Sequence, residues 1–284
     1  MTAAWNALAI LFRNLPDLMD TGFAGAMTAA TGSVAKGFSG SESTPPGVYF
    51  SQAFHGYNIG TSGMNTLIFP LIEKIKDISN GSLSINYTIT EYPSYFNFLY
   101  DGRSGEEEAG QISLLSTHLL GRAQLSDLPM ETVAAYLQRA LASQSGSGSQ
   151  MIVGLQGGPG PANVPEGMRG SLNPVWREAY LHVITLGAMI DDTLTPNKSL
   201  SQAAGWMEQN KEALWREWAP DMGAYINEGN PYNTEWKHDF FGTSYDRLAE
   251  IKKKFDPTGS LYILAGVRSD EWDYDLDTGK LCRV

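Results

Sequence analysis

Four strand-like segments of this sequence place apolar side chains on one face, and helical patterns separate them. The segments are Val48–Phe54, Ser82–Tyr92, Met151–Gln156 and Ala179–Met189. Alternation with a period of two is typical of a strand that buries one face, whereas strands of a parallel sheet are apolar on both faces. The pattern predicts an α+β fold, an antiparallel β-sheet with helices covering one face.

Apolar residues at helical spacing mark five further segments. They are residues 4–20, 67–78, 127–141, 199–218 and 243–255. Two stretches are expected to be loops: Thr31–Gly47, rich in Gly, Ser and Pro, and residues 101–110, which contain three consecutive glutamates. Trp206, Trp215 and Trp218 fall at helical spacing, which favours core or interface anchors over a ligand shelf.

Charge and cysteine content exclude several classes of function. The chain has 20 Lys and Arg against 31 Asp and Glu, a net charge of -11, and no basic run, so nucleic acid is not an expected partner. The apolar stretch Trp5–Phe12 is too short to span a bilayer and lacks a basic leader, so neither a membrane span nor a signal peptide is expected. With Cys282 as the one cysteine, no internal disulfide or thiolate metal cluster can form.

Short motifs do not indicate a metal or phosphate site. The glycines of Gly154–Gly160 lack the spacing of a nucleotide loop, and the two prolines nearby remove backbone donors. The four histidines, His55, His118, His182 and His238, form no metal-binding pair, so no metal is expected. His182 lies within an apolar strand candidate, where it either faces a pocket or is a hydrogen-bonded structural residue.

The segment Gly223–Pro231 and the aromatic and glycine residues that follow it, as far as Gly259, resemble the C-terminal end of the berberine-bridge-like FAD-linked oxidases, particularly their fungal members. Asn173–Arg177 and the pair Glu271-Trp272 are similar to further landmarks of that family. The resemblance covers essentially the whole chain. It implies that residues 1–284 form a single substrate domain, with an opening helix at 4–20 and a C-terminal helix and tail at 243–284.

The resemblance also implies a cofactor. In this family the sheet roofs the isoalloxazine ring of FAD, and a separate N-terminal domain holds most of the cofactor. No glycine-rich pyrophosphate segment and no flavin-linking histidine precede Trp5. We therefore expect this chain to lack the main FAD-binding domain and to receive the flavin from another chain or domain.

Site residues follow from the resemblance one at a time. Asn227 and Tyr225 match positions near the flavin, and Glu228 matches a position where several relatives carry a catalytic tyrosine that acts as a base. A carboxylate there can act as a base, or as an acid if burial raises its pKa. The alternative is that Glu228 caps or salt-bridges a loop. His118 stands where relatives commonly carry arginine, so the resemblance implies no role for it.

Substrate contacts are expected on the open face of the sheet. The candidates are polar and aromatic residues of the strand segments, or their neighbours of opposite parity, because the sequence does not show which parity faces the pocket. These candidates are Tyr49, Ser51, Tyr87, His182 and Thr185.

Three functions remain open. The first is the substrate domain of an FAD-linked oxidoreductase that acts on a small organic molecule of specialised metabolism. The second is a flavin-independent isomerase or cyclase with Glu228 as its acid or base. The third is a non-catalytic subunit whose apolar surface binds a flavin-binding domain, a second chain or another copy of itself as a homo-oligomer.

Overall fold

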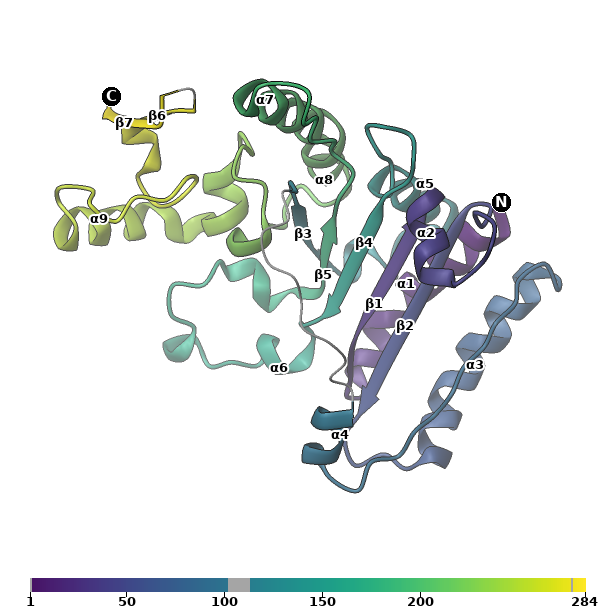
Figure 1. The fold of residues 1–284 in the computed structure, drawn as a ribbon. Coiled ribbons are helices and arrows are strands. Elements are labelled where there is room, and N and C mark those ends of the chain that lie inside the picture. Colours follow the sequence, from purple (N-terminus) through teal and green to yellow (C-terminus); the bar gives the residue numbers. More distant parts are fainter. Residues whose placement is uncertain (1, 102–112, 277) are drawn as a thin grey trace.

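The computed structural model describes residues 2–101, 113–276 and 278–284 (Figure 1). A five-stranded antiparallel sheet of order β2-β1-β4-β5-β3 lies at its centre. This arrangement confirms the predicted fold class. The strands are β1 (Phe23–Thr31), β2 (Val48–Gly56), β3 (Ser116–Gly121), β4 (Gln150–Leu155) and β5 (Ala179–Thr185).

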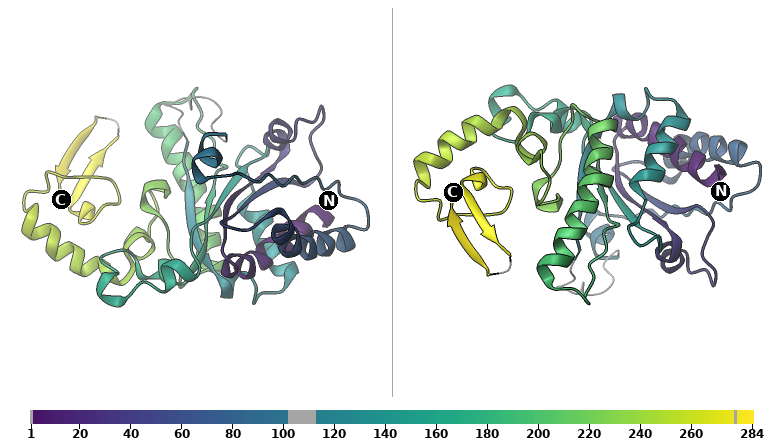
Figure 2. Two further views of the ribbon diagram at one scale, coloured as in Figure 1. Left: turned by 90° about the horizontal axis from the view of Figure 1, so that it is seen from below. Right: turned by 90° about the horizontal axis from the view of Figure 1, so that it is seen from above.

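Helices lie on both faces of this sheet, but they cover only one of them. The two views of Figure 2 show α1, α3 and α5 on one side, and α2 and α4 towards the ends of the other. A second, two-stranded sheet closes the chain: β6 (Trp272–Asp275) with β7 (Lys280–Arg283). The helices are α1 (Thr2–Asp20), α2 (Gly32–Ser39), α3 (Thr61–Ser79), α4 (Tyr95–Asp101), α5 (Met130–Ala140), α6 (Pro159–Ala162), α7 (Pro196–Met207), α8 (Ala213–Trp218) and α9 (Tyr245–Phe255).

The main core forms where α1 packs on the sheet. Leu8 and Phe12 of α1 are fully buried, in one cluster with Met27 of β1 and Val153 of β4. Met27 and Val153 pair directly across the two strands, so their side chains share a face. Each such burial is worth about 2 kcal/mol. The sheet face towards α1 is therefore the buried face.

Three sequence-based predictions about strands were wrong. Ser82–Tyr92 forms no strand, because Leu83 and Ile85 pack against the helical side of the core without a strand partner. The apolar run from Ala179 is a strand only as far as Thr185. Four strands were missed, β1, β3, β6 and β7; β1, for example, is composed largely of Ala, Gly and Thr and carries a weak apolar pattern.

The helix predictions are more accurate. Each of the five predicted segments contains a helix, and α3 ends as expected, with Asn80 in the left-handed conformation as its C-cap. The predicted loop Thr31–Gly47 contains α2. Trp215 and Trp218 are core residues, as predicted. The loop predicted at residues 101–110 lies outside the described residues except for its first position. No helix among the described residues is both long and apolar enough to cross a bilayer.

Two neighbouring ionisable side chains are buried where α7 continues into α8 through a π-helical turn, Glu208–Glu212. The Nζ of Lys211 donates to the carbonyl oxygens of Ala140 (2.5 Å) and Ala142 (2.7 Å) at the end of α5. Burial lowers the pKa of Lys211 to about 7 and raises that of Glu212 to about 8. Glu212 is therefore mostly neutral at pH 7.

Replacing Glu212 by Gln should weaken the pH dependence of stability. The folded state keeps the Glu212 proton up to about pH 8, whereas in the unfolded chain the carboxyl has its ordinary pKa of 4.5 and releases the proton near that pH. The free energy of unfolding therefore falls as pH rises through this window, by up to roughly 1 kcal/mol per pH unit. Urea unfolding at several pH values measures the slope. The control is Glu166→Gln at an exposed position, which should leave the slope unchanged. Equal slopes in wild type and E212Q would contradict the raised pKa of Glu212.

Candidate functional site

A buried backbone junction holds residues 223–228 against the edge of the sheet. The amide of Leu119 in β3 donates to the carbonyl oxygen of Gly223 (2.7 Å). The next backbone amide (2.7 Å) and the side-chain amide of Asn173 (3.0 Å) both donate to the carbonyl oxygen of Asp239. A Cβ at position 223 would stand 2.5 Å from that oxygen, so only glycine fits here. The junction determines where the next five residues lie.

His182 and Glu228 meet beside this junction. His182 belongs to β5, and Glu228 ends a short turn, Ile226–Glu228. The Nε2 of His182 bonds the hydroxyl of Thr117 on β3, and its Nδ1 lies 3.6 Å from Oε2 of Glu228. A carboxylate can only accept, so the favoured tautomer has its proton on Nδ1, and Thr117 then donates to Nε2.

Aromatic rings enclose the His182 imidazole. Tyr225 packs edge-on against it with ring centroids 5.5 Å apart, and Trp176 lies 5.9 Å away. The two aromatic rings also contact each other edge-on at 6.0 Å. The side chain of His182 is only 1% exposed, and burial lowers its pKa to about 4. His182 is therefore neutral at physiological pH.

The predicted residues Tyr225, Asn227 and Glu228 lie together. The side-chain amide of Asn227 donates to the hydroxyl of Tyr225 (2.7 Å), and Asn227 is exposed. The side chain of Glu228 is 41% exposed. Among the described residues Glu228 forms no ion pair with Lys or Arg, and its titratable neighbour, His182, is neutral. A carboxylate beside a neutral imidazole can accept a proton or return one at this point of the sheet.

Two of the predicted substrate contacts lie elsewhere. Thr185 is on β5 with His182 but has the opposite parity: it is fully buried opposite Met151, on the helix-covered face, and donates to the carbonyl oxygen of Ser116 (3.3 Å). Tyr87 belongs to no strand and packs edge-on against Phe69 of α3 (5.8 Å). Thr185 lies on the helix-covered face because the sequence does not show which parity faces the helices. Tyr87 lies outside the sheet because Ser82–Tyr92 has no strand partner.

The other three predicted contacts, Tyr49, Ser51 and His182, point to the face of the sheet that the helices leave open. Tyr49 and Ser51 alternate with Val48 and Phe50, which pack in the core, so they lie on the same face as His182. They belong to β2, however, at the far edge of the sheet from β5. His182 is hydrogen-bonded to Thr117 and lies beside Glu228, and its contact with a substrate stays a prediction.

Thr117 and Trp176 are site residues that the sequence did not indicate as such. Thr117 was missed because β3 was not recognised as a strand. Trp176 stands in the landmark Asn173–Arg177 of the family resemblance, and that landmark was the available signal. His118 points to the helical side, where it stacks on Trp215 and bonds the carbonyl oxygen of Ala219 (3.1 Å).

The described residues offer neither a metal site nor a phosphate cradle in the glycine-rich segment. Within residues 2–101, 113–276 and 278–284, no three His, Cys, Asp or Glu side chains are placed to hold a metal ion. The amides of Gly157 and Gly158 donate to the carbonyl oxygens of Tyr180 (3.0 Å) and Ala179 (2.9 Å). These donors are therefore not free for a pyrophosphate.

We expect His182 to remain neutral, with its proton on Nδ1, down to about pH 4. A histidine in the unfolded chain takes up a proton near 6.5, so the free energy of unfolding should fall as pH drops from 6.5 to about 4. Imidazole ¹⁵N shifts measured by NMR report both tautomer and charge, and His182→Asn identifies the signal. A ring that titrates near 6.5, or that carries its proton on Nε2, would contradict this geometry.

Comparison with known proteins gives relatives for almost the entire chain. Residues 224–267, which include Tyr225, Asn227 and Glu228, match the family model described as berberine and berberine like. A VAO-type flavoprotein oxidase of Thermothelomyces thermophilus is 27% identical over 99% of this chain and 44% of its own length. An FAD-linked oxidoreductase of Gibberella fujikuroi is 26% identical over 98% of this chain and 46% of its own length.

Solved structures show the same fold. A VAO-type flavoprotein of Myceliophthora thermophila superposes with a TM-score of 0.83 at 20% identity, over 99% of this chain and 47% of that one. The berberine bridge enzyme of Eschscholzia californica gives a TM-score of 0.55 at 12% identity, over 94% of this chain and 52% of its own. The chain thus spans about half the length of the proteins it matches. Residues 224–267 match the berberine-like family model, and the chain as a whole is similar to FAD-linked oxidoreductases over less than half of their length.

Proposed function

We propose that this chain is the substrate-binding and catalytic part of an FAD-linked oxidoreductase that acts on a small organic molecule of specialised metabolism. The observation that carries the proposal is the meeting of Glu228 and His182 on the uncovered face of the sheet, 3.6 Å apart. A proton-accepting carboxylate beside an open face is what removal of a hydride and a proton from a substrate requires. The FAD-linked relatives support the redox assignment.

The residues of this chain fit the flavin ring but not the whole cofactor. FAD, when bound, supplies the hydride acceptor. Asn227 and Tyr225, joined by their hydrogen bond beside Glu228, are the groups that would contact the ring. The amides of Gly157 and Gly158 are already used within the chain, so the phosphates have no cradle there. We assign the rest of FAD binding to another domain or chain.

Glu228 would take the proton that the substrate loses. Its neighbour His182 is neutral, and Nδ1–H points towards the carboxylate across 3.6 Å, so the imidazole does not neutralise the carboxylate. Thr117 fixes the imidazole from the other side, and the rings of Tyr225 and Trp176 exclude water from it. The flavin-binding domain or chain, lying over the open face of the sheet, would exclude water from Glu228 as well.

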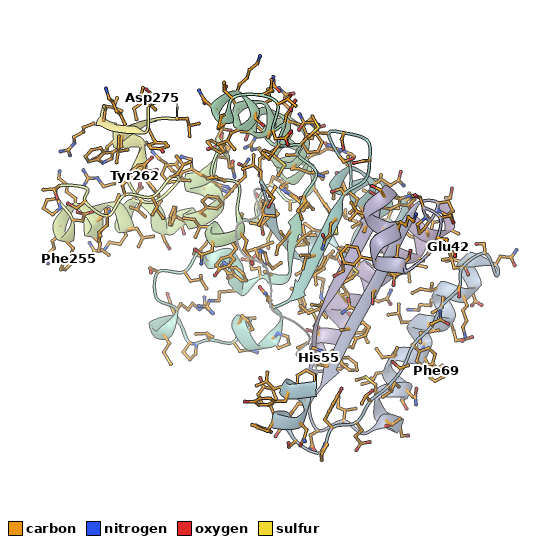
Figure 3. All side chains as sticks on the ribbon, in the orientation of Figure 1. Glu42, His55, Phe69, Phe255, Tyr262 and Asp275 are labelled. Carbon is orange, nitrogen blue, oxygen red and sulfur yellow. The ribbon has the colours of Figure 1, made fainter. Side chains whose placement is uncertain are left out.

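Exposed apolar side chains in the C-terminal part of the chain support an interface with a separate flavin-binding part. Phe255, Leu261 and Ile263 are 75%, 75% and 60% exposed. Leu261 and Ile263 line a cavity of about 400 Å³ whose wall also includes Ile226 and Trp272. Figure 3 shows this region at the far end from α3. Exposed apolar groups of this kind mark a protein interface. We assign the surface to the flavin-binding part, because more than half of the relatives' length lies outside their match to this chain.

The purified chain alone should show no visible flavin absorbance. A flavin-binding part of a relative, added in trans with FAD, should form a complex detectable by sedimentation, and Leu261→Asp with Ile263→Asp should weaken it, since charge opposes burial. Asp substitution of exposed Tyr57 at the other end of the chain is the control. A chain that is yellow when purified alone would refute the proposal that it lacks the main FAD-binding domain. Self-association without binding of the flavin-binding part would indicate a homo-oligomer.

Glu228→Gln should lower turnover by about 10²–10⁴ in the assembled enzyme, because the amide cannot take the substrate proton. Steady-state rates measure this, and circular dichroism verifies the fold. Glu235→Gln, at an exposed position nearby, is the matched control and should retain activity. Full activity of E228Q would remove the acid–base role and favour a non-catalytic subunit.

One relative supports a second candidate function. A bifunctional decalin synthase of Penicillium decumbens is 25% identical over 99% of this chain and 45% of its own length. Glu228 could likewise promote isomerisation or cyclisation of a conjugated substrate by proton transfer alone, with no change in oxidation state. The discriminating measurement is substrate conversion with flavin removed: conversion that persists and depends on Glu228 would establish the isomerase or cyclase.

A further inference from the structure

Glu228 lies on a closed loop, residues 224–239. The amide of Ala224 donates to the carbonyl oxygen of Asp239 (2.7 Å), so the two ends of the loop are joined. Compact loops with joined ends are packed by their own side chains. Within this loop the side chain of Asn233 is only 2% exposed. The contacts of Asn233 therefore bear on where Glu228 lies.

Asn233 joins a carboxylate on one side to a guanidinium on the other. Its Nδ2 donates to Oδ2 of Asp239 (2.7 Å), and its Oδ1 accepts from Nη2 of Arg216 (2.9 Å) and from the amide of Glu235 (2.8 Å). These partners determine which way the amide group faces. Asp239 is buried too, and its Oδ1 accepts from Nδ1 of His238 (2.9 Å). Both ends of this row are charged, so its hydrogen bonds are stronger than bonds between neutral groups.

A π-helical turn directs Arg216 at the loop. Residues eight apart in a regular α-helix lie about 80° apart around its axis. The turn Glu208–Glu212 takes up one residue more than an α turn, which brings residue 216 back to nearly the same side as Glu208. Nη1 of Arg216 donates to Oε1 of Glu208 (2.5 Å), and the hydroxyl of Thr234 donates to the same oxygen (2.7 Å). The helix therefore holds the loop at two neighbouring positions, 233 and 234.

The helix that carries Arg216 is tied to the same strand as the site. Trp215 is 1% exposed, and its Nε1 donates to Oγ of Ser116 on β3 (2.8 Å). The next residue of β3, Thr117, bonds the imidazole of His182. A loop held by α8 is thus held in a defined position relative to His182.

We infer that Arg216, Asn233 and Asp239 are positioning residues for Glu228. They act on the site through the loop, which they keep closed and attached to α8. The 3.6 Å between Glu228 and His182 is too long for a strong hydrogen bond, so this contact alone would not restore the carboxylate to its place if the loop opened. The inference rests on the proposed function for the role of Glu228 in the reaction, but the closure of the loop does not depend on that function.

Reversing the bond between Asn233 and Asp239 tests the inference. Asn233→Asp places two buried carboxylates at hydrogen-bond distance, where they repel. Adding Asp239→Asn again sets a donor opposite an acceptor, and the double variant N233D/D239N has the same total charge as the wild type. Hydrogen exchange of the Ala224 amide, followed by NMR in the purified chain, measures opening of the loop. The imidazole ¹⁵N signals of His182 report the surroundings of Glu228.

N233D should raise the exchange rate of the Ala224 amide by about tenfold or more and shift the His182 signals, because the loop opens more often. In the assembled enzyme it should lower kcat by roughly tenfold to a hundredfold and leave KM within about threefold, since displacement of Glu228 alters the reacting geometry more than substrate binding. The double variant should return exchange, signals and kcat to within about threefold of the wild type.

The matched control is Asn210→Asp, the same substitution at a half-buried position of the π turn. The amide of Asn210 donates to the carbonyl oxygen of Trp206 (2.9 Å) in its own helix. N210D should leave the exchange rate and kcat within about twofold of the wild type. Circular dichroism verifies that each variant folds.

Exchange in N233D equal to that in N210D would overturn the inference. A double variant that exchanges as fast as N233D, or that does not fold, would overturn it too, as would a loosened loop with wild-type kcat in an enzyme that E228Q inactivates. If N233D alone fails to fold, the exchange rate of the double variant decides. The exchange measurement needs neither flavin nor turnover, so full activity of E228Q would remove the proposed function and leave this test of the loop intact.

Discussion

The packing of α1 on one face of the sheet is the interaction on which the rest of the structure depends. Leu8 and Phe12 are fully buried in one cluster with Met27 and Val153. Because side chains alternate along a strand, every second residue of β1 and β4 then points into this core. Because paired residues of neighbouring strands point to the same face, every second residue of β2, β5 and β3 also faces α1. The residues of opposite parity, including His182, are left on the other face. The position of the candidate site thus follows from hydrophobic burial on the opposite side of the sheet.

A second constraint places Glu228 beside His182. The two residues are far apart in sequence, and neither has a strong partner that would bring them together directly. They meet because the carbonyl oxygen of Asp239 accepts from Asn173 and from the backbone after Gly223, while Gly223 itself bonds the edge of β3. These are backbone contacts in a buried place, where an unsatisfied group is costly. The geometry of the candidate site is therefore maintained by residues that lie outside it.

Much of this fold could be predicted from the sequence, and the failures have physical causes. The patterns of β2, β4 and β5 and of the main helices are strong because each element has one apolar face. β1 was missed because its outward residues are mostly alanines, which give little contrast between an apolar and a polar face. Ser82–Tyr92 was assigned as a strand because its alternation reflects packing of Leu83 and Ile85 alone, without a strand partner.

For the site, the sequence by itself determined the chemical groups and their local order. The run Tyr225–Glu228, through its likeness to a known family, indicated which residues to expect beside the flavin and which carboxylate to expect as acid or base. Only the tertiary structure decided that His182 belongs with them and that Thr185 and Tyr87 do not. The reason is that parity has a period of two, so a strand pattern fits either face equally well, and only the packing of α1 selects one.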